Sequence, residues 1–559
     1  MKPAQLKIIE LPRNEVEELL QRAAGALQPE DYQLFKAVVE SYAYLTDLVE
    51  DKSTTIQRLR KLLFGASSEK TRAVFETPPD AAGATPPATS SDRTIATANT
   101  TTAATPRQGH GRHAAADYAG ATKIPVSHAS LHAGDACPEC QQGTVYESAQ
   151  PGVLVRFAGQ APLQARIYEL QKLRCNLCGH VFTAAPPPGV GPEKYDATAG
   201  SMLALLKYGT GLPFHRLEGL QASLGLPLPA ATQWDIVHDL AKRIEPVYEE
   251  LIRQAAQGEV LFNDDTTIKI LELMGKRAAA RQQAEATGES ADTSQGQRRG
   301  MFTSGIISTN GGQRIALFFT GRQHAGENLA DVLTHRAAPL GPPIQMCDAL
   351  SRNLPADLRT ILAHCLAHGR RQFVDVAERF PTQCRHVLDQ LAEVYKNDEL
   401  ARAQKLPPEA RLQFHQAHSG PVLERLKDWL NAQFTDRLVE PNSALGEAIT
   451  YLLKHWEKLT LFLRQPGAPL DNNVCERALK RAILHRKNAL FFKTCHGAHV
   501  GDVFMSLIHT CQLCKANPFD YLTALQNHPA ELSVKPVRWM PWNYREALKP
   551  AAPRPRTVT

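Results

Sequence analysis

The chain has 559 residues, too many for a single hydrophobic core, which predicts several domains. Its 63 lysines and arginines against 57 aspartates and glutamates give a net charge of +6, which permits a polyanionic partner without demanding one. We find neither an apolar signal-peptide core nor an uncharged stretch long enough to cross a bilayer. We therefore expect a cytoplasmic protein without membrane segments, whose 11 cysteines are thiols or metal ligands rather than disulfides.

The first 122 residues are predicted to hold a helical oligomerisation region, residues 1–73, and a linker. Between Asp31 and Phe64 the chain has no proline or glycine, and apolar residues recur at alternating steps of three and four. This period favours a coiled coil, and hence a homodimer or higher oligomer, over an amphipathic helix packed on its own domain. Residues 74–122 are rich in alanine, threonine and proline, which predicts a flexible linker.

Residues 123–190 carry two short cysteine motifs, CPEC and CNLC, separated by β-type sequence. Two C-x-x-C pairs bring four thiolates into the tetrahedral arrangement that structural Zn²⁺ prefers. The alternative, unliganded core cysteines, does not explain two identical spacings. We therefore predict a zinc ribbon with the ligands Cys137, Cys140, Cys175 and Cys178.

Residues 191–257 are predicted to be a helical region with a helix-turn-helix-like pattern. Gly225 and Pro227 supply a turn between two amphipathic segments, and the second segment begins near Ala230. The spacing is compatible with DNA binding through the second helix, although many two-helix hairpins share it.

Strand patterns begin at Val260. VLFNDDTTIKILEL, GMFTSGIIST and RIALFFTG are predicted to form antiparallel strands, with a hairpin turn at Asn310–Gly312. A helix, the short strand IQMCDAL and a further helix follow. This order is typical of a ribonuclease-H-like fold, so the chain is predicted to be a multidomain α+β protein. We assign its parts as a catalytic core (258–373 and 466–505), a helical insertion (374–465) and a C-terminal helical tail (506–559).

The first strand raises the question of why a buried segment would contain two adjacent carboxylates. Successive strand side chains point to opposite faces, which places Asp264 with Phe262 and Ile268 on the apolar face and Asp265 on the wetter one. An ionised carboxylate on an apolar face is costly unless it is paired or binds a metal. A turn or a strand-end salt bridge is the alternative for an isolated aspartate.

Two further carboxylates are candidates for a shared site. Asp348 comes where the apolar strand IQMCDAL gives way to polar residues, and Glu476 lies on a helix that begins after Asp471. Surrounding lysines and arginines make a solvated ion-pair face the alternative for Glu476. Three carboxylates from two strands and a helix are what a site for two divalent metals requires.

These motifs together resemble the IS66 family of insertion-sequence transposases, which belong to the DDE class. The resemblance extends over nearly the whole chain, through LRKLLFGASSEK, CPEC…CNLC, KYDATAGSMLALLKYGTGLPFHRLEGLQ, HCLAHGRRQF and LDNNVCERALKRAILHRKN. It implies that Asp264, Asp348 and Glu476 are a catalytic triad that holds Mg²⁺ or Mn²⁺. The chain departs from the family pattern at Asp265, where glutamate is usual, and after Asp348, where a glycine and an aromatic residue are usual.

The segment HCLAHGRRQF has its own alternatives. His364 and His368 are predicted one helical turn apart, but Cys365 stands where a metalloprotease motif needs glutamate. The family comparison implies that His368, Arg370 and Arg371 position DNA beside the active site, and a basic helix face is the alternative. We expect the cations of the glutamate helix to bind phosphates as well: Arg477, Lys480, Arg481, Arg486 and Lys487.

The sequence thus predicts a DNA transposase that binds terminal inverted repeats and cuts and joins DNA through a DDE triad. Family resemblance implies that small accessory proteins of the element are possible partners. A ribonuclease-H-like nuclease that cuts without joining is one alternative, and a catalytically inactive zinc-ribbon DNA-binding protein is another. Zinc-dependent hydrolysis is disfavoured because four cysteines leave no open position on the ion.

Overall fold

We describe a computed structural model of the chain over these residues: 23, 25, 28, 31–33, 35, 36, 130–146, 160–174, 181–191, 193–275, 300–355 and 360–549. The chain divides into two compact units, residues 80–167 and residues 1–79 with 168–559, and each is described by itself. Most of the predicted heptad seam and the whole 74–122 linker lie outside the described residues. Among the described helices, none is long and apolar enough to span a membrane.

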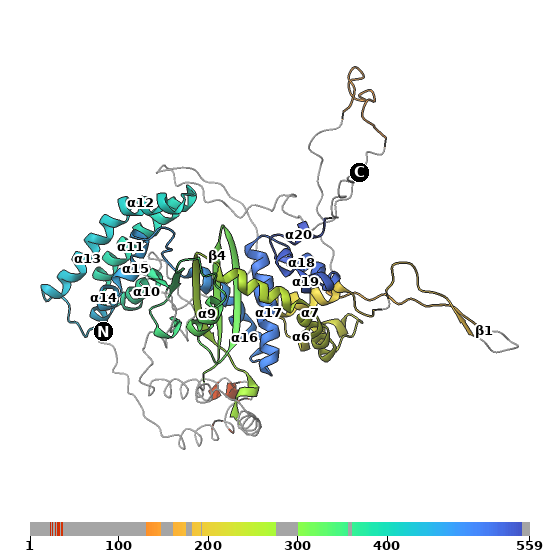
Figure 1. The fold of residues 1–559 in the computed structure, drawn as a ribbon, viewed down its shortest axis with the longest axis horizontal. Helices are drawn as coiled ribbons and strands as arrows, with labels where there is room; N and C mark the ends of the chain where they lie inside the picture. Colours follow the sequence, from red (N-terminus) through yellow and green to blue (C-terminus); the bar gives the residue numbers. More distant parts are fainter. Residues whose placement is uncertain are drawn as a thin grey trace, which may run out of the picture. The chain divides into compact units, whose positions relative to one another are not determined.

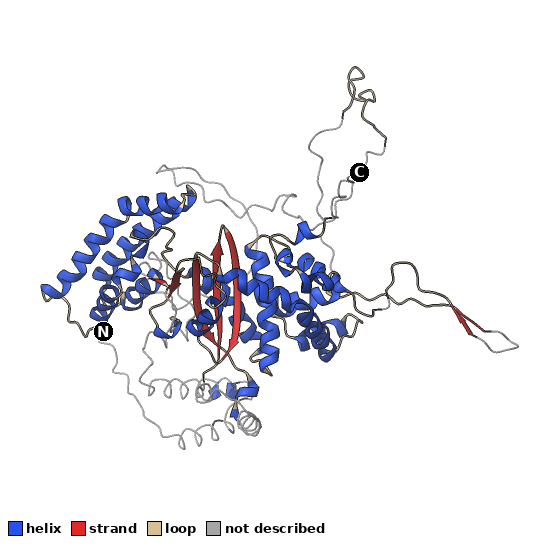
Figure 2. Cartoon of the chain, in the orientation of Figure 1, coloured by secondary structure: helices blue, strands red, loops and turns tan. Residues whose placement is uncertain are grey.

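A five-stranded mixed sheet lies at the centre of the larger unit and has helices packed on it (Figures 1 and 2). Of the strands in this sheet, the first three in chain order pair antiparallel, and the last two continue the sheet in parallel. In spatial order the strands are β5 (Gln313–Gly321), β4 (Phe302–Asn310), β3 (Val260–Thr267), β6 (Ile344–Cys347) and β7 (Ile361–His364). The central strand is therefore β3, which carries the two adjacent aspartates.

Two details of the sheet test the sequence expectations. The β4–β5 hairpin is confirmed: Gly311 and Gly312 have φ values of 54° and 85°, which only glycine adopts without strain. The prediction that a helix follows directly after the fourth strand was wrong, because β7 comes first and contains His364. A run of four residues such as ILAH is too short for the spacing of its apolar residues to distinguish a strand from a helix.

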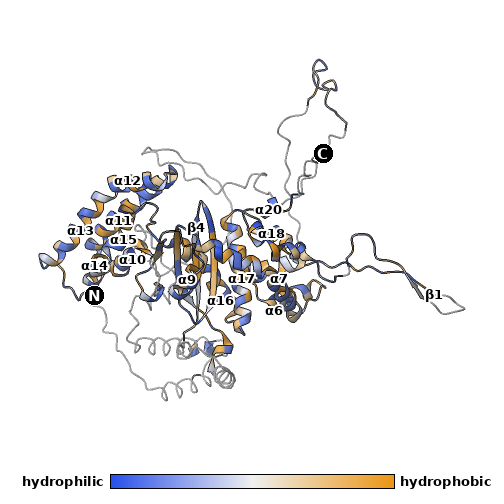
Figure 3. Ribbon diagram, in the orientation of Figure 1, coloured by the Kyte–Doolittle hydropathy of each residue, from blue (hydrophilic) through white to orange (hydrophobic). Residues whose placement is uncertain are grey.

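Helices α7 (Ala230–Ala256), α9 (Ala325–Leu333), α16 (Asn473–Ala489) and α17 (Cys495–Leu513) pack against this sheet, and hydrophobic residues gather where they meet it (Figure 3). The predicted two-helix pattern is present, since α6 (Phe214–Ser223) ends before Gly225, whose φ is 74°. Helix α7 runs on for 27 residues and packs on the sheet, where the hydroxyl of Tyr248 donates to the Phe318 carbonyl at 3.2 Å. The second helix of the pair is thus part of the sheet's core packing.

Helix α17 covers the outer edge of β5 through polar side chains spaced four residues apart, which we call the α17 ladder. The backbone N–H groups of Thr320, Phe318 and Ala316 donate to Asp502 (2.7 Å), Ser506 (2.9 Å) and Thr510 (3.0 Å), respectively. Four helical residues rise about 6 Å and two strand residues about 6.8 Å, so the two spacings nearly match. Burial raises the pKa of Asp502 to about 7, against the hydrogen bonds from Thr320.

Replacing Thr510 with valine is expected to destabilise the fold by about 1–3 kcal/mol, because its hydroxyl accepts from the Ala316 N–H and donates to the Ala316 carbonyl at 3.2 Å. Valine keeps the shape but leaves both backbone groups buried without a partner. Thr510→Ser is the matched control, since it retains the hydroxyl. Urea unfolding of both variants measures the difference, and equal stability of the two would contradict the ladder's role.

The insertion between β7 and α16 is helical, as predicted for residues 374–465. After α10 (Leu366–Val376) its elements are α11 (Pro381–Ala403), α12 (Pro408–His418), α13 (Gly420–Thr435), α14 (Ala444–Lys454), α15 (Trp456–Leu459) and the short η5 (Leu461–Leu463). A charged cluster holds α11 to α12: Asp398 binds Arg411 at 2.6 Å and lies 3.3 Å from His415 Nε2. Its other oxygen binds Arg402 at 2.6 Å.

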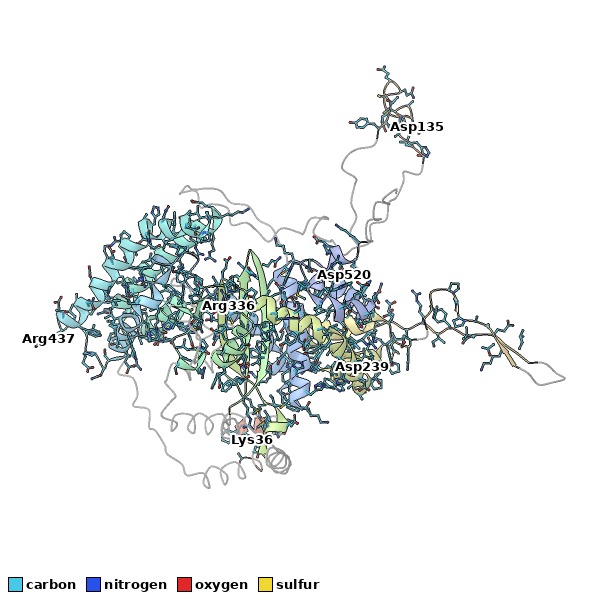
Figure 4. The ribbon with its side chains drawn as sticks, in the orientation of Figure 1. Lys36, Asp135, Asp239, Arg336, Arg437 and Asp520 are labelled. Carbon is cyan, nitrogen blue, oxygen red and sulfur yellow. The ribbon has the colours of Figure 1, made fainter. Side chains whose placement is uncertain are left out.

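The larger unit contains several further short elements. They are the β1 (Lys172–Arg174) and β2 (Val181–Thr183) hairpin, α5 (Ala197–Ala204), η2 (Leu205–Gly209), η3 (Leu271–Leu273), η4 (Ser351–Asn353), α18 (Pro518–Asn527), α19 (Pro529–Val534), η6 (Pro536–Trp539) and α20 (Tyr544–Ala547). Helix α18 binds α5, with the Gln526 amide donating to the Ala197 carbonyl at 2.7 Å. Arg336, labelled in Figure 4, donates to the carbonyls of Ala256, Gly258 and Gly341, which fixes the entries to β3 and β6.

Candidate active site

Sheet register brings the first two predicted carboxylates level with each other. Strands β3 and β6 are parallel, and Phe262 pairs with Met346. Asp264 lies two residues after Phe262 and is still in β3. Asp348 lies two residues after Met346, just past the end of β6. Parallel strands keep such residues at neighbouring positions, so the two aspartates come to the same end of the sheet.

The third carboxylate, Glu476, lies in the first turn of α16, which packs over β3 and β4. Gly305 of β4, the register partner of Asp264, makes this close packing possible. A Cβ atom at this glycine would lie 3.0 Å from Leu479 Cδ2, and the Cys475 thiol already donates to the Gly305 carbonyl at 3.2 Å. The glycine therefore lets α16 approach the strand that carries Asp264.

The charges in this region make Asp264 an unusual aspartate. Burial, and after it the negative charges of Asp348, Asp265 and Glu476, raise its pKa to about 7, although the Asp265 N–H donates to its carboxylate at 2.8 Å. Both causes disfavour the charged form, and both are reversed by a bound cation. Among the described residues no cation pairs with this largely buried acid, which lies beside three other carboxylates.

Asp348 is held in place by its neighbours. Its Oδ1 accepts from the Leu350 N–H at 3.1 Å and from the Asn353 amide at 2.5 Å. The Asn353 carbonyl in turn accepts from Asn263 and Gln345, both at 2.8 Å. This network joins the carboxylate to β3 and β6 and orients it, and no cation among the described residues pairs with it.

The prediction that Asp265 lies on a wetter face was wrong. Its side chain is only 2% exposed, and its two oxygens face His324 at 2.8 Å and Arg352 at 3.4 Å. Strand β3 is central in the sheet, and α9 covers the face on which Asp265 lies. Residue alternation separates the two faces of a strand but does not show whether the second face is covered.

Glu476 has a thiol, an imidazole and a guanidinium around it. His368 Nε2 lies 3.8 Å from its Oε1, and Arg371 lies 3.9 Å from its Oε2. Cys365, at the start of α10, completes a group with His368 and Glu476 whose potential ligand atoms are all within 4.8 Å of one another. Among the described residues the three predicted carboxylates do not form so compact a group. The sequence analysis assigned no ligand role to Cys365, because this residue stands where a metalloprotease motif needs glutamate.

The predicted phosphate-binding arginines and lysines fall into three groups. Arg486 donates to both the Thr266 and Thr267 hydroxyls, and Arg481 donates to the Gly209 carbonyl, so these two side chains hold other elements to α16. Arg370 and Arg371 of α10 are partly buried. The exposed cations of α16 are Arg477, Lys480 and Lys487.

Half of the predicted zinc site is described. Cys137 and Cys140 flank a tight turn in which the Cys137 N–H donates to the Gly143 carbonyl at 2.7 Å and the Gln141 N–H donates to the Cys137 carbonyl at 2.9 Å. The backbone N–H groups of Gln142 and Gly143, followed by the Cys137 side chain, lower the pKa of the Cys140 thiol. Cys175 and Cys178 lie outside the described residues.

Comparison with known proteins identifies a family whose model matches this chain. The family model described as "Transposase IS66 family" matches residues 194–500, which are more than half of the 559 residues. Similar proteins include three uncharacterized proteins of Sinorhizobium fredii. The protein y4jD is 27% identical over 384 residues, covering 66% of this chain and 71% of the relative. The proteins y4hP (25% over 417 residues, 67% of each chain) and y4qI (24% over 352 residues, 61% of each chain) are also similar.

The matched region begins just before α5 and ends within α17, so it contains β3, β6, the helical insertion and α16. All three candidate carboxylates therefore lie inside it. The chain belongs to the IS66 family of transposases.

Proposed function

We propose that this protein is a DDE transposase that cleaves phosphodiester bonds at the ends of its element and transfers the strands to target DNA. The observation that carries the proposal is the meeting of Asp264 and Asp348 at one sheet end, beneath the helix that presents Glu476. The order of antiparallel and parallel strands supports a ribonuclease-H-like fold for this core. On that fold the three residues act together as acidic ligands.

The residues present fit a divalent metal centre. Asp264 has a raised pKa because it is buried among acids, and Glu476 Oε1 is a buried atom to which no described residue donates a hydrogen bond. Asp264, Asp348 and Glu476 would hold Mg²⁺ or Mn²⁺ through hard oxygen ligands. When bound, a pair of such ions activates the attacking oxygen and stabilises the leaving one.

The rest of the site would position DNA. Arg371 and His368 lie beside Glu476, where a phosphate group approaching the carboxylates would find donors. Arg477, Lys480 and Lys487 extend this positive surface along α16, and they carry no sequence readout because they suit any phosphate backbone. Asp265 keeps β3 in place through His324 and Arg352 and is assigned no chemical step.

Recognition of the terminal inverted repeats is assigned to the N-terminal and zinc-ribbon regions. In this proposal Cys137, Cys140, Cys175 and Cys178 bind structural Zn²⁺, which the lowered pKa of Cys140 supports. The heptad pattern between Asp31 and Phe64 would join two chains, as two DNA ends require. The protein would act on DNA in the cytoplasm, with small proteins of the same element as further partners.

The test is a reaction of the full chain with labelled DNA that carries an end of the element, in Mg²⁺. Asp348→Asn and Glu476→Gln are each expected to lower cleavage and joining by about a thousand-fold or more, since each removes a ligand charge, while end binding persists. Asp239→Asn is the control, because Asp239 lies exposed on α7 away from the site (labelled in Figure 4). Any accessory proteins of the element belong in every reaction.

Three other outcomes would contradict the proposal in different ways. Cleavage without joining would identify a nuclease on the same fold. Binding of the DNA ends with no metal-dependent cleavage in any protein would leave a DNA-binding protein. Full activity in Glu476→Gln would remove this residue from the triad.

A further inference from the structure

We infer that Cys365, His368 and Glu476 form a second metal site, which takes a borderline-soft divalent ion such as Zn²⁺. The potential ligand atoms of the three side chains all lie within 4.8 Å of one another. A thiol and an imidazole select Zn²⁺ or Co²⁺ over Mg²⁺, so the chemistry of this site differs from that of three carboxylates. It also differs from the predicted zinc ribbon, because it has only three protein ligands.

The backbone at the start of α10 fixes two of the ligands. Cys365 is the residue before the first turn of α10, and His368 lies in that turn, with its N–H donating to the Cys365 carbonyl at 3.2 Å. The Cys365 N–H donates to the Cys347 carbonyl of β6 at 2.9 Å, and the Leu366 N–H donates to the Leu470 carbonyl at 3.0 Å. The turn is thus attached on both sides, and its two ligand residues are held at one place.

Asn472 connects this turn to the third ligand. Its N–H donates to the Cys365 sulfur at 3.2 Å, and its carbonyl accepts from the Glu476 N–H at 3.1 Å. One residue therefore sets the distance between the cysteine and the glutamate. An N–H group directed at a sulfur is also the kind of outer contact that orients a thiolate ligand and spreads its charge.

Two polar atoms of the group are buried among the described residues without a hydrogen-bond partner, Glu476 Oε1 and His368 Nδ1. The 3.8 Å between Glu476 Oε1 and His368 Nε2 is too long for a hydrogen bond. A tetrahedral Zn²⁺ ion with bonds of about 2.0–2.3 Å holds its ligand atoms roughly 3.3–3.8 Å apart, so a small contraction would complete the site.

Binding of the ion requires loss of the thiol proton. Burial raises the pKa of the Cys365 thiol to about 12, so the side chain is neutral without a metal. The incoming ion displaces the thiol proton to solvent, and sulfur, nitrogen and oxygen become its ligands. One position remains for water, and Arg371 keeps its contact with the other Glu476 oxygen.

If the proposed catalytic role of Glu476 is correct, this site also gives a means of control. Zn²⁺ bound to Cys365, His368 and Glu476 would withdraw the glutamate from the carboxylate triad. We expect low concentrations of Zn²⁺ to inhibit Mg²⁺-dependent cleavage. This consequence rests on the proposed function, whereas binding of the ion does not.

The test is direct binding of Co²⁺ and Zn²⁺ to the full chain, counted by native mass spectrometry and by the charge-transfer absorption of cobalt–thiolate bonds. The proteins are wild type, Cys365→Ser, Glu476→Gln and the control Cys384→Ser, which alters a fully buried thiol on α11 outside the group. All four keep the ribbon cysteines, so those contribute equally. Thermal unfolding without metal confirms that each protein is folded.

Wild type and Cys384→Ser are expected to bind one ion more than Cys365→Ser, with at least about a ten-fold weaker affinity at this site in Glu476→Gln. The same number of ions and the same affinities in all four proteins would overturn the inference. Inhibition by Zn²⁺, normalised to each protein's own rate, should need at least about ten-fold more Zn²⁺ in Cys365→Ser. Absence of cleavage in wild type would refute the proposed function alone, because the binding result would still decide this site.

Discussion

Asp264→Asn is expected to lower metal-dependent DNA cleavage by about a thousand-fold or more and, at the same time, to stabilise the metal-free protein. The two effects share one cause. Burial and the charges of Asp348, Asp265 and Glu476 raise the pKa of Asp264 to about 7, so its ionised form opposes folding. Asparagine removes that charge and keeps the shape of the side chain, but it also removes the negative charge through which Asp264 is proposed to hold a metal ion.

The pH dependence of the stabilisation follows from the sign of the shift. An acid whose pKa is higher in the folded than in the unfolded protein destabilises the fold as pH rises above the unfolded value. The gain from asparagine should be absent below about pH 4, grow toward pH 7, and reach roughly 2–4 kcal/mol above it. Thermal unfolding in Mg²⁺-free buffer across this range measures it, and added Mg²⁺ should stabilise wild type only.

The neighbouring residue gives a matched control for this prediction. Asp265→Asn makes the same chemical change one position along β3, but Asp265 has His324 and Arg352 as positive or hydrogen-bonding partners. We expect that variant to be less stable than wild type. If both variants changed stability in the same direction, the assignment of Asp264 as the unpaired acid would be wrong.

Asp398→Asn is expected to destabilise the helical insertion by about 3 kcal/mol, because it leaves the largely buried guanidinium of Arg411 without its anion. The Asp398 side chain is 5% exposed and binds Arg402 and Arg411, each at 2.6 Å. Burial favours the neutral acid, but the His415 hydrogen bond and the charges of Arg411 and Arg402 outweigh it and lower the pKa of Asp398. Chemical unfolding, followed by the tryptophan fluorescence to which Trp429 in α13 and Trp456 in α15 contribute, measures the loss.

Its pH dependence has the opposite sign to that of Asp264. A lowered pKa stabilises the fold above the unfolded value and loses that contribution as pH falls through the folded one. The difference between wild type and Asp398→Asn should therefore shrink as pH falls below about 4. Asp389→Asn, an exposed aspartate on the same helix, should leave stability within about 0.5 kcal/mol of wild type. An equal loss in both variants would contradict the role of the cluster.

The sequence pattern was sufficient to place the candidate carboxylates on their elements. Asp264 lies in strand β3, Asp348 directly follows the apolar strand β6, and Glu476 lies in the first turn of a helix, as the periodicity predicted. The N-cap signal before α16 predicted its start near Asp471, and the Asn-Gly-Gly signal predicted the β4–β5 hairpin. These are local properties, and local sequence is enough to determine them.

What the pattern missed depends on contacts between distant segments. Strand β7 has only four residues and becomes recognisable by pairing with β6, which no period within it reveals. The partners of Asp265 come from the N-cap of α9 and from η4, so its burial could not be predicted from β3 alone. Cys365 was set aside because it broke a known motif, whereas its nearness to Glu476 depends on Asn472.

The α17 ladder also bears on how two copies of this protein can associate. An exposed strand edge is an ordinary route to assembly, since a second chain can pair with its unused backbone groups. On β5 the outward N–H groups of residues 316, 318 and 320 are already bound to α17, and the carbonyls of residues 316 and 318 accept from Thr510 and Tyr248. Any association between two copies of this protein must therefore use other surfaces, because this edge of β5 is closed to pairing with a second sheet.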